Sequence, residues 1–260
     1  MVSIKAVKAI KFTPSLLFRF LLIPARKVRN PCLYCPGICI ASCPTFLRSG
    51  NLILSPLGYS RNPDIGKERC LKCWRCVSDC PLSYKLPDTF SEEVELKMEV
   101  LREGSLMLVC VRGLDEQYGL RMANELRSGL CVIDGLLRRY DEGCKLNERS
   151  LEKIKNKLKK FDEVISLSPE ASHALDIPFF PEKAHKFPVY IDYSGPIHIP
   201  CLLIDRAQDI LKGLISIGAR PTDVLRDSCI KLDRVEALIL CPRASSMSLT
   251  CFYDLVKFKY

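Results

Sequence analysis

The sequence predicts an α/β fold preceded by a small cysteine-rich domain. Two patterns lead to this prediction. Eight of the fifteen cysteines lie between residues 32 and 80, and from residue 106 onward apolar runs alternate with amphipathic segments. The chain has 260 residues, of which 48% are hydrophobic, so it can bury a sizeable core and is not a disordered protein.

Basic residues are concentrated in the N-terminal part of the chain. Residues 1–63 contain nine Lys and Arg and no Asp or Glu, which accounts for the whole net charge of +9. Residues 1–30 therefore form a basic N-terminal arm, whose apolar run at 16–23 is too short to cross a bilayer. The arm would pack on the next domain, dock onto an acidic partner, or contact an anionic membrane surface. Nothing in it indicates base recognition, so no nucleic-acid partner is expected.

The cellular compartment follows from what this segment lacks. The apolar run of the arm is too short for a membrane-spanning helix, and the arm lacks the small-residue cleavage site of a secretory leader. The chain is therefore expected to be cytoplasmic, or peripheral at the membrane through its arm. In a reducing compartment, cysteines bind metals or remain thiols rather than forming disulfides. The cysteines are therefore expected to carry the function.

The clustered cysteines form two motifs. The first is Cys32-x2-Cys35-x3-Cys39-x3-Cys43-Pro44, and the second is Cys70-x2-Cys73-x2-Cys76-x3-Cys80-Pro81. The second motif matches the run that binds a [4Fe–4S] cluster in bacterial ferredoxins, and the first has one additional residue. Residues 31–90 are therefore predicted to be a ferredoxin-type domain with two [4Fe–4S] clusters.

Three closely spaced thiolates reach only three irons of a cubane, so the fourth iron takes a remote cysteine. In two-cluster ferredoxins the cysteine before proline binds the other cluster. Applied here, this gives two crossed ligand sets: Cys32, Cys35, Cys39 and Cys80 for one cluster, and Cys70, Cys73, Cys76 and Cys43 for the other. Zinc is the alternative metal, because Cys-x2-Cys pairs also form tetrahedral zinc sites. The additional residue leaves a shifted ligand or a smaller cluster as further alternatives for the first motif.

Local patterns predict the remaining elements. Residues 44–69 read as loop with a short strand at 51–54, and residues 91–104 as a helix that links two domains. Further strands are predicted at residues 106–111, 130–133 and 164–167, and helices at residues 116–126 and 151–161. Strands that alternate with helices are typical of α/β architecture.

The region from residue 105 to residue 260 contains an internal repeat. A predicted strand is followed by Ser-Pro at residue 168 in one copy and by Cys-Pro at residue 241 in the other, then by Ala-Ser and a predicted helix. The repeat divides this region into two α/β halves, about 105–185 and 186–260. Each half has an earlier strand, at residues 106–113 and 189–195 respectively.

A two-cluster ferredoxin-type domain followed by two α/β repeats resembles the iron-sulfur subunits of the heterodisulfide reductase, glycolate oxidase and anaerobic glycerol-3-phosphate dehydrogenase group. In that family each repeat carries a cysteine-rich motif named for its Cys-Cys-Gly. This chain keeps two of the motif cysteines per repeat, Cys110 with Cys144 and Cys229 with Cys241. The resemblance implies degenerate CCG-type repeats, neither of which supplies the four thiolates that a cluster needs.

The sequence thus predicts a metal-binding electron-transfer subunit of a larger oxidoreductase complex, with other redox subunits as partners and no catalytic residue of its own. The alternative is a catalytic, heterodisulfide-reductase-like subunit with a residual site made of Cys110, Cys144, Cys229 and Cys241. A third reading gives the clusters a purely structural role. No dinucleotide or P-loop motif is present. Surface or loop positions are expected for His173, His185 and His198.

Overall fold

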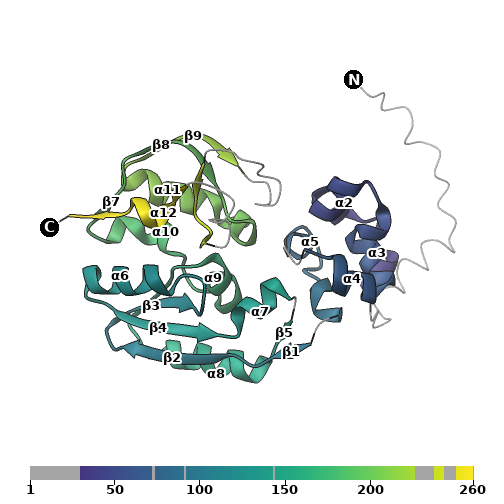
Figure 1. Cartoon of the computed structure of the whole chain (residues 1–260), viewed down its shortest axis with the longest axis horizontal. Helices are drawn as coiled ribbons and strands as arrows, with labels where there is room; N and C mark the ends of the chain where they lie inside the picture. The colour runs from purple at the N-terminus through teal and green to yellow at the C-terminus, as the bar shows by residue number, and fades with distance from the viewer. Residues whose placement is uncertain are drawn as a thin grey trace, which may run out of the picture.

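The computed structural model describes residues 30–71, 74–90, 92–142, 144–225, 237–242 and 250–259. Its architecture is mixed α/β, as predicted. The short helices of residues 30–90 lie on one side of the molecule and the two larger sheets on the other (Figure 1). Within the described ranges, no helix has the length and apolar character needed to cross a membrane. The basic arm lies outside them, apart from Asn30.

Prolines begin most of the short helices before residue 70. They occupy the first position of η2 (Pro31–Tyr34), α2 (Pro44–Ser49), α3 (Pro56–Arg61) and α4 (Pro63–Arg69), where the fixed φ of proline is suited to a helix. The side chains of Asn51 and Ser55 cap η4 (Leu52–Leu54) and α3. The predicted loop with a strand at 51–54 is therefore wrong, because its proline, asparagine and serine residues start helices. The remaining helices of this part are η3 (Ile38–Ser42), α5 (Arg75–Ser78) and η5 (Leu86–Phe90).

The linker helix predicted at 91–104 is also wrong. This segment forms β1 (Glu93–Val94) and β2 (Lys97–Arg102). Apolar residues at 94, 96 and 98 alternate with charged ones, which is the period of a strand rather than a helix. Pairing with distant segments completes the strands: β1 lies parallel to β5 (Lys145–Leu146), and β2 lies antiparallel to β4 (Gly129–Asp134).

The first large sheet has the strand order β2-β4-β3-β6, in which β3 (Leu106–Val111) is parallel to both β4 and β6 (Glu163–Ser166). The predicted strands at 106–111, 130–133 and 164–167 are confirmed, as is the helix at 116–126, which is α6 (Glu116–Leu126). The helix predicted at 151–161 is α8 (Glu148–Leu158), and it begins earlier because Asn147 caps the Ser150 N–H at 2.9 Å. The short helix α7 (Leu136–Asp141) follows β4.

The second large sheet has the order β11-β10-β8-β9, with all neighbours parallel. Its strands are β8 (Tyr193–His198), β9 (Ala219–Leu225), β10 (Leu238–Ile239) and β11 (Thr250–Cys251). In the first sheet, β3 lies between β4, the next large strand in the chain, and the later strand β6. In the second sheet, β8 lies in the same way between β9 and the later strand β10. The helix after the central strand is α6 in the first sheet and α11 (Ala207–Ser216) in the second. The two halves therefore share one order of parallel strands.

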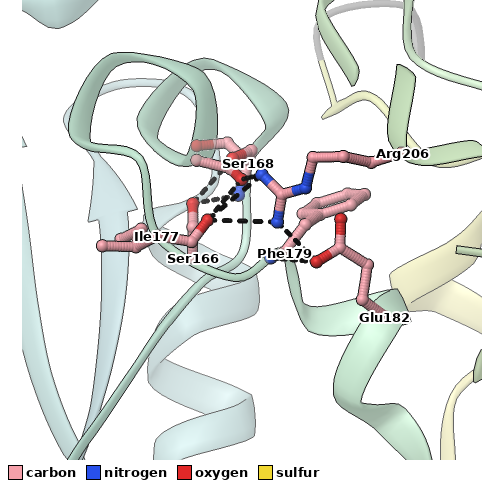
Figure 2. Close-up of polar contacts among 7 residues, drawn as sticks. Ser166, Ser168, Ile177, Phe179, Glu182 and Arg206 are labelled. Carbon is pink, nitrogen blue, oxygen red and sulfur yellow. Dashed lines mark hydrogen bonds and ion pairs between the residues drawn. The ribbon is translucent and has the colours of Figure 1, made fainter. Parts of the chain in front are cut away.

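Helices between the sheets join the two halves into a single core. These are α9 (Pro169–Leu175), α10 (Phe180–Lys183), η6 (Ala184–Lys186), η7 (Cys201–Arg206) and α12 (Phe252–Leu255), with a small antiparallel sheet of β7 (Val189–Tyr190) and β12 (Lys257–Phe258). Figure 2 shows Arg206 of η7 reaching the first half, where its guanidinium donates to Ser172 Oγ at 2.8 Å and to the carbonyl of Ile177 at 3.3 Å. Arg206 also pairs with Glu182, whose side chain is largely buried. The pair is therefore an internal link between the halves rather than a surface ion pair.

Candidate functional site

The first cysteine motif folds around a surface cavity. Cys32 lies in η2, Cys35 at its end and Cys39 in η3. Between the last two, Gly37 has a φ of 82°, a left-handed conformation that favours glycine. The Gly37 N–H donates a hydrogen bond to Cys35 Sγ at 3.4 Å. The Pro36-Gly37 turn thus accommodates the additional residue of this motif.

The cavity has a volume of about 610 Å³ and is lined by Cys32, Cys35 and Cys39 together with Cys80 of the second motif. Burial raises the pKa of Cys32 to about 11, and the charges of Cys80 and Cys35 add to the shift. Burial raises the pKa of Cys39 to about 12, with further contributions from Cys32, Cys35 and Cys80. The thiols of Cys35 and Cys80 thus lie close enough to oppose the ionisation of Cys32 and Cys39. A positively charged metal core among them would relieve this repulsion, because bound cations deprotonate thiols.

The second cavity is lined by Cys43, Cys70 and Cys76, three members of the other predicted ligand set. The fourth, Cys73, lies outside the described residues. Cys76 also lines the first cavity, so the two cavities are adjacent. The second has a volume of only about 20 Å³, close to the space of one water molecule. A [4Fe–4S] cluster needs more room than this cavity provides.

Hydroxyl groups lie next to the sulfur of Cys43. Its Sγ is 3.0 Å from Thr45 Oγ1, and the hydroxyl of Tyr59 donates to the same oxygen at 3.0 Å. Because Thr45 accepts from Tyr59, its own hydroxyl proton can point toward the Cys43 sulfur. Such donors favour a sulfur that carries negative charge.

Across the described ranges, no group of three or more Cys, His, Asp or Glu side chains converges to hold one metal ion. The first cavity has the thiols of Cys32, Cys35, Cys39, Cys76 and Cys80 around an open space and a backbone N–H directed at sulfur, and thiolates are the donors that hold [4Fe–4S] clusters. The second cavity offers the same type of donor without the required space.

The cysteines of the α/β part fall into different surroundings. Cys110 is buried on β3, and its pKa is raised well above the ordinary value by burial and then by the charges of Asp115 and Cys131. The groups around Cys144 are different: burial raises its pKa, and the nearby Arg138 guanidinium opposes that rise. No interaction joins Cys110 to Cys144 among the described residues. Cys229 lies outside the described ranges.

Cys110 and Cys241 do approach one region from opposite halves. Burial raises the pKa of Tyr253 well above its usual value, and the charges of both thiols are among the further causes. The thiol of Cys241 donates to Glu170 Oε1 at 3.6 Å. Of the three described cysteines of the residual site, Cys110 and Cys241 therefore approach one region beside carboxyl groups, and Cys144 lies elsewhere.

Asp115 is fully buried at the start of α6 and accepts a hydrogen bond from the Val111 N–H at 2.6 Å. Burial raises the pKa of Asp115 to about 8. The hydrogen bond from Val111 opposes this rise, and the charge of Glu170 adds to it. The ordinary value is 3.8, so between about pH 4 and pH 8 the folded state holds a proton that the unfolded chain has lost. The free energy of unfolding should therefore fall as the pH rises through this window.

Asp115→Asn keeps the acceptor for the Val111 N–H and removes the titration, so it should flatten this pH dependence. Urea unfolding of both proteins at several pH values between 5 and 8 measures the two slopes. Equal slopes in the variant and the unmodified protein would show that Asp115 does not hold the proton.

Residues 74–90 meet the α/β part at a group of side chains from Trp74, Asp88, Arg139 and Tyr140. The guanidinium of Arg139 lies 3.8 Å from the centre of the Trp74 ring and pairs with Asp88 at 3.1 Å. The Trp74 and Tyr140 rings meet edge to face. Asp88 and Arg139 are 51 residues apart, so no local pattern marks them.

The histidine prediction is correct only for His185, which is exposed in η6. The prediction is wrong for His198, because this residue is buried in β8. The prediction is also wrong for His173, which is partly buried in the helix α9. Burial lowers the pKa of His173 to about 4. His173 Nδ1 lies 3.0 Å from the hydroxyl of Tyr140, whose own proton is donated to the Glu170 carbonyl. Nδ1 therefore carries the proton of the neutral ring.

Eight cysteines thus remain the strongest candidate site, seven of them in the described part and distributed over two adjacent cavities. Comparisons of this chain with protein-family models, with curated proteins and with solved structures give no match.

Proposed function

We propose that this chain is an iron-sulfur electron-transfer subunit of a larger oxidoreductase complex. It holds two [4Fe–4S] clusters with crossed ligands. Cys32, Cys35, Cys39 and Cys80 bind one cluster, and Cys70, Cys73, Cys76 and Cys43 bind the other. The observation that carries the proposal is the grouping of Cys80 with Cys32 and Cys39, residues more than 40 positions away, around one cavity.

When bound, such clusters accept and release one electron at a time. Polar groups of the chain lie next to two of the proposed ligand sulfurs. The Gly37 N–H donates to Cys35, and the Thr45 hydroxyl lies against Cys43. Adjacent cavities that share Cys76 suit transfer between the two clusters.

The surface around the first cavity supports exchange of electrons with another redox subunit. Tyr34, Ile38 and Leu82 line this cavity and remain 76%, 56% and 71% exposed. Large apolar side chains that stay exposed around a site are typical of protein contacts. The common strand order of the two sheets supports a second element of the proposal, that residues 105–260 are two degenerate CCG-type repeats. The cytoplasm is the proposed location, because a chain with fifteen cysteines suits a reducing compartment, where cysteines bind metals or remain thiols.

Metal and sulfide analysis of the anaerobically purified protein tests the proposal. We expect about eight irons and about eight acid-labile sulfides per chain, with a paramagnetic signal from the reduced clusters. About twelve irons would indicate a further cluster and favour the catalytic alternative. Zinc without sulfide would overturn the proposal.

A further inference from the structure

The strand β2 forms one edge of the first large sheet. In the order β2-β4-β3-β6 it pairs with β4 on one side only, and Figure 1 shows it at the outer side of the sheet with α8 next to it. All but one of its six residues are exposed, including the apolar Val100 and Leu101 at 36% and 44%. The described part of the chain therefore leaves one row of β2 backbone groups open for pairing with a further strand.

A surface groove of about 540 Å³ lies between the start of β2 and α8. Leu96 and Ile154, both almost fully buried, give it an apolar lining. The Leu96 N–H donates a hydrogen bond to Ser150 Oγ at 3.1 Å, which ties the segment before β2 to the helix. The groove is therefore held by the fold rather than by loosely packed elements.

Lysine side chains surround this groove. Four of them line it, against one acidic residue, Glu95: Lys97 on β2, and Lys153, Lys157 and Lys160 on α8 or directly after it. All four are exposed, and none of them forms an ion pair with a carboxylate of the described residues. Like charges that gather around one groove repel one another, so the carboxylates of a partner would relieve this repulsion.

The open strand edge and the lysines together favour one type of occupant. An extended peptide can form hydrogen bonds along an exposed strand, and acidic side chains on it would meet the lysines. A lipid headgroup or a free phosphate would use the positive charge and leave the strand edge unpaired. A second copy of β2 is disfavoured, because it would bring Lys97 and Arg102 toward further positive charges.

We propose that β2 and α8 form a docking groove for an extended acidic segment of a partner protein, which adds a strand to the first sheet at β2. Backbone hydrogen bonds to β2 align the segment, and its carboxylates lie over Lys97, Lys153 and Lys157. The lysines also speed the encounter, an effect that salt weakens. This groove shares no lining residue with the two cysteine cavities, so the inference goes beyond the proposed function and does not need a bound cluster.

A labelled peptide in which Glu alternates with Thr is the probe, because it is acidic and threonine favours strands. Fluorescence anisotropy with the full chain measures its dissociation constant. Lys153→Gln with Lys157→Gln should weaken binding about tenfold, since two charge pairs are lost. Lys155→Gln with Lys159→Gln is the matched control: it removes the same charge from the same part of the chain, outside the groove, and should change binding less than about twofold.

Amide hydrogen exchange tests whether the peptide adds a strand. Exchange within residues 97–102 should slow when the peptide is bound, because the open backbone groups of β2 gain hydrogen bonds. A second peptide, in which Pro replaces each Thr, keeps the carboxylates but cannot pair as a strand. This peptide should bind about tenfold more weakly than the first.

Three results would overturn the inference. Equal losses in the two lysine pairs would show that the overall charge of α8, and not the groove, drives binding. Unchanged exchange at residues 97–102, or equal binding of the proline peptide, would show that no strand is added. Binding to vesicles of phosphatidylserine and phosphatidylcholine through Lys153 and Lys157, without binding of the peptide, would assign the lysines to a membrane surface. None of these results bears on the iron content, which tests the proposed function separately.

Discussion

Cys80→Ser is expected to remove the proposed cluster whose other three proposed ligands lie in the first motif. Cys80 belongs to the second motif by sequence, but it lines the first cavity, and its charge raises the pKa of both Cys32 and Cys39. The variant should retain about four of about eight irons per chain, because a cubane that loses one of its four protein ligands is no longer held. Iron analysis of anaerobically prepared protein measures the loss.

Two double variants identify which cluster is lost. Under crossed ligation, Cys80→Ser with Cys35→Ser affects a single cluster and should leave about four irons, whereas Cys80→Ser with Cys70→Ser affects both and should leave almost none. Ligation within each motif predicts the reverse result for the two pairs. Cys201→Ser, at a half-buried cysteine of η7 outside both sets, is the control and should keep about eight irons.

Tyr253→Ala is expected to cause the largest loss of stability in the α/β part. Tyr253 lies in α12 with no exposed surface, packs against Tyr118 and Phe252, and donates its hydroxyl to the carbonyl of Leu167. Arg121 of α6 donates to its backbone carbonyl. The side chain therefore fills space between the halves, and its removal should lower the free energy of unfolding by about 3–5 kcal/mol.

Urea unfolding followed by far-ultraviolet circular dichroism measures this change. Tyr253→Phe should cost about 1 kcal/mol, because it removes only the hydrogen bond to Leu167. Tyr190→Ala is the matched control at a tyrosine that is 38% exposed on β7, and it should change stability by about 0.5 kcal/mol or less. Equal losses at positions 190 and 253 would show that the C-terminal helix does not complete the core.

The sequence by itself determined the features that depend on near neighbours in the chain. Continuous apolar runs such as Leu106–Val111 become strands buried on both faces, and the pattern of Glu116–Leu126 becomes a helix with the same bounds. Cysteine spacing identified the candidate ligands, because a metal or cluster loop needs its donors within a few residues of one another. In each case one local period or spacing is sufficient.

Tertiary structure decided the features that depend on distant partners. Residues 93–102 become strands rather than a helix because β4 and β5 supply hydrogen-bond partners that begin some 30 residues or more further along the chain. The prolines and the asparagine of residues 44–69 start helices that pack on one another, although the same residues elsewhere form turns. The intrinsic preference of a short segment for helix, strand or turn is weak, so strand pairing and packing override it.

The same division applies to the candidate site. The cysteine spacing alone predicts Cys80 as a ligand, and only the fold brings it to the same cavity as Cys32 and Cys39. Trp74 was visible inside its motif, but Arg139 and Asp88, which hold its ring, carry no signal in the sequence. Contacts between side chains far apart in the chain leave no periodic pattern, because each depends on how whole elements pack.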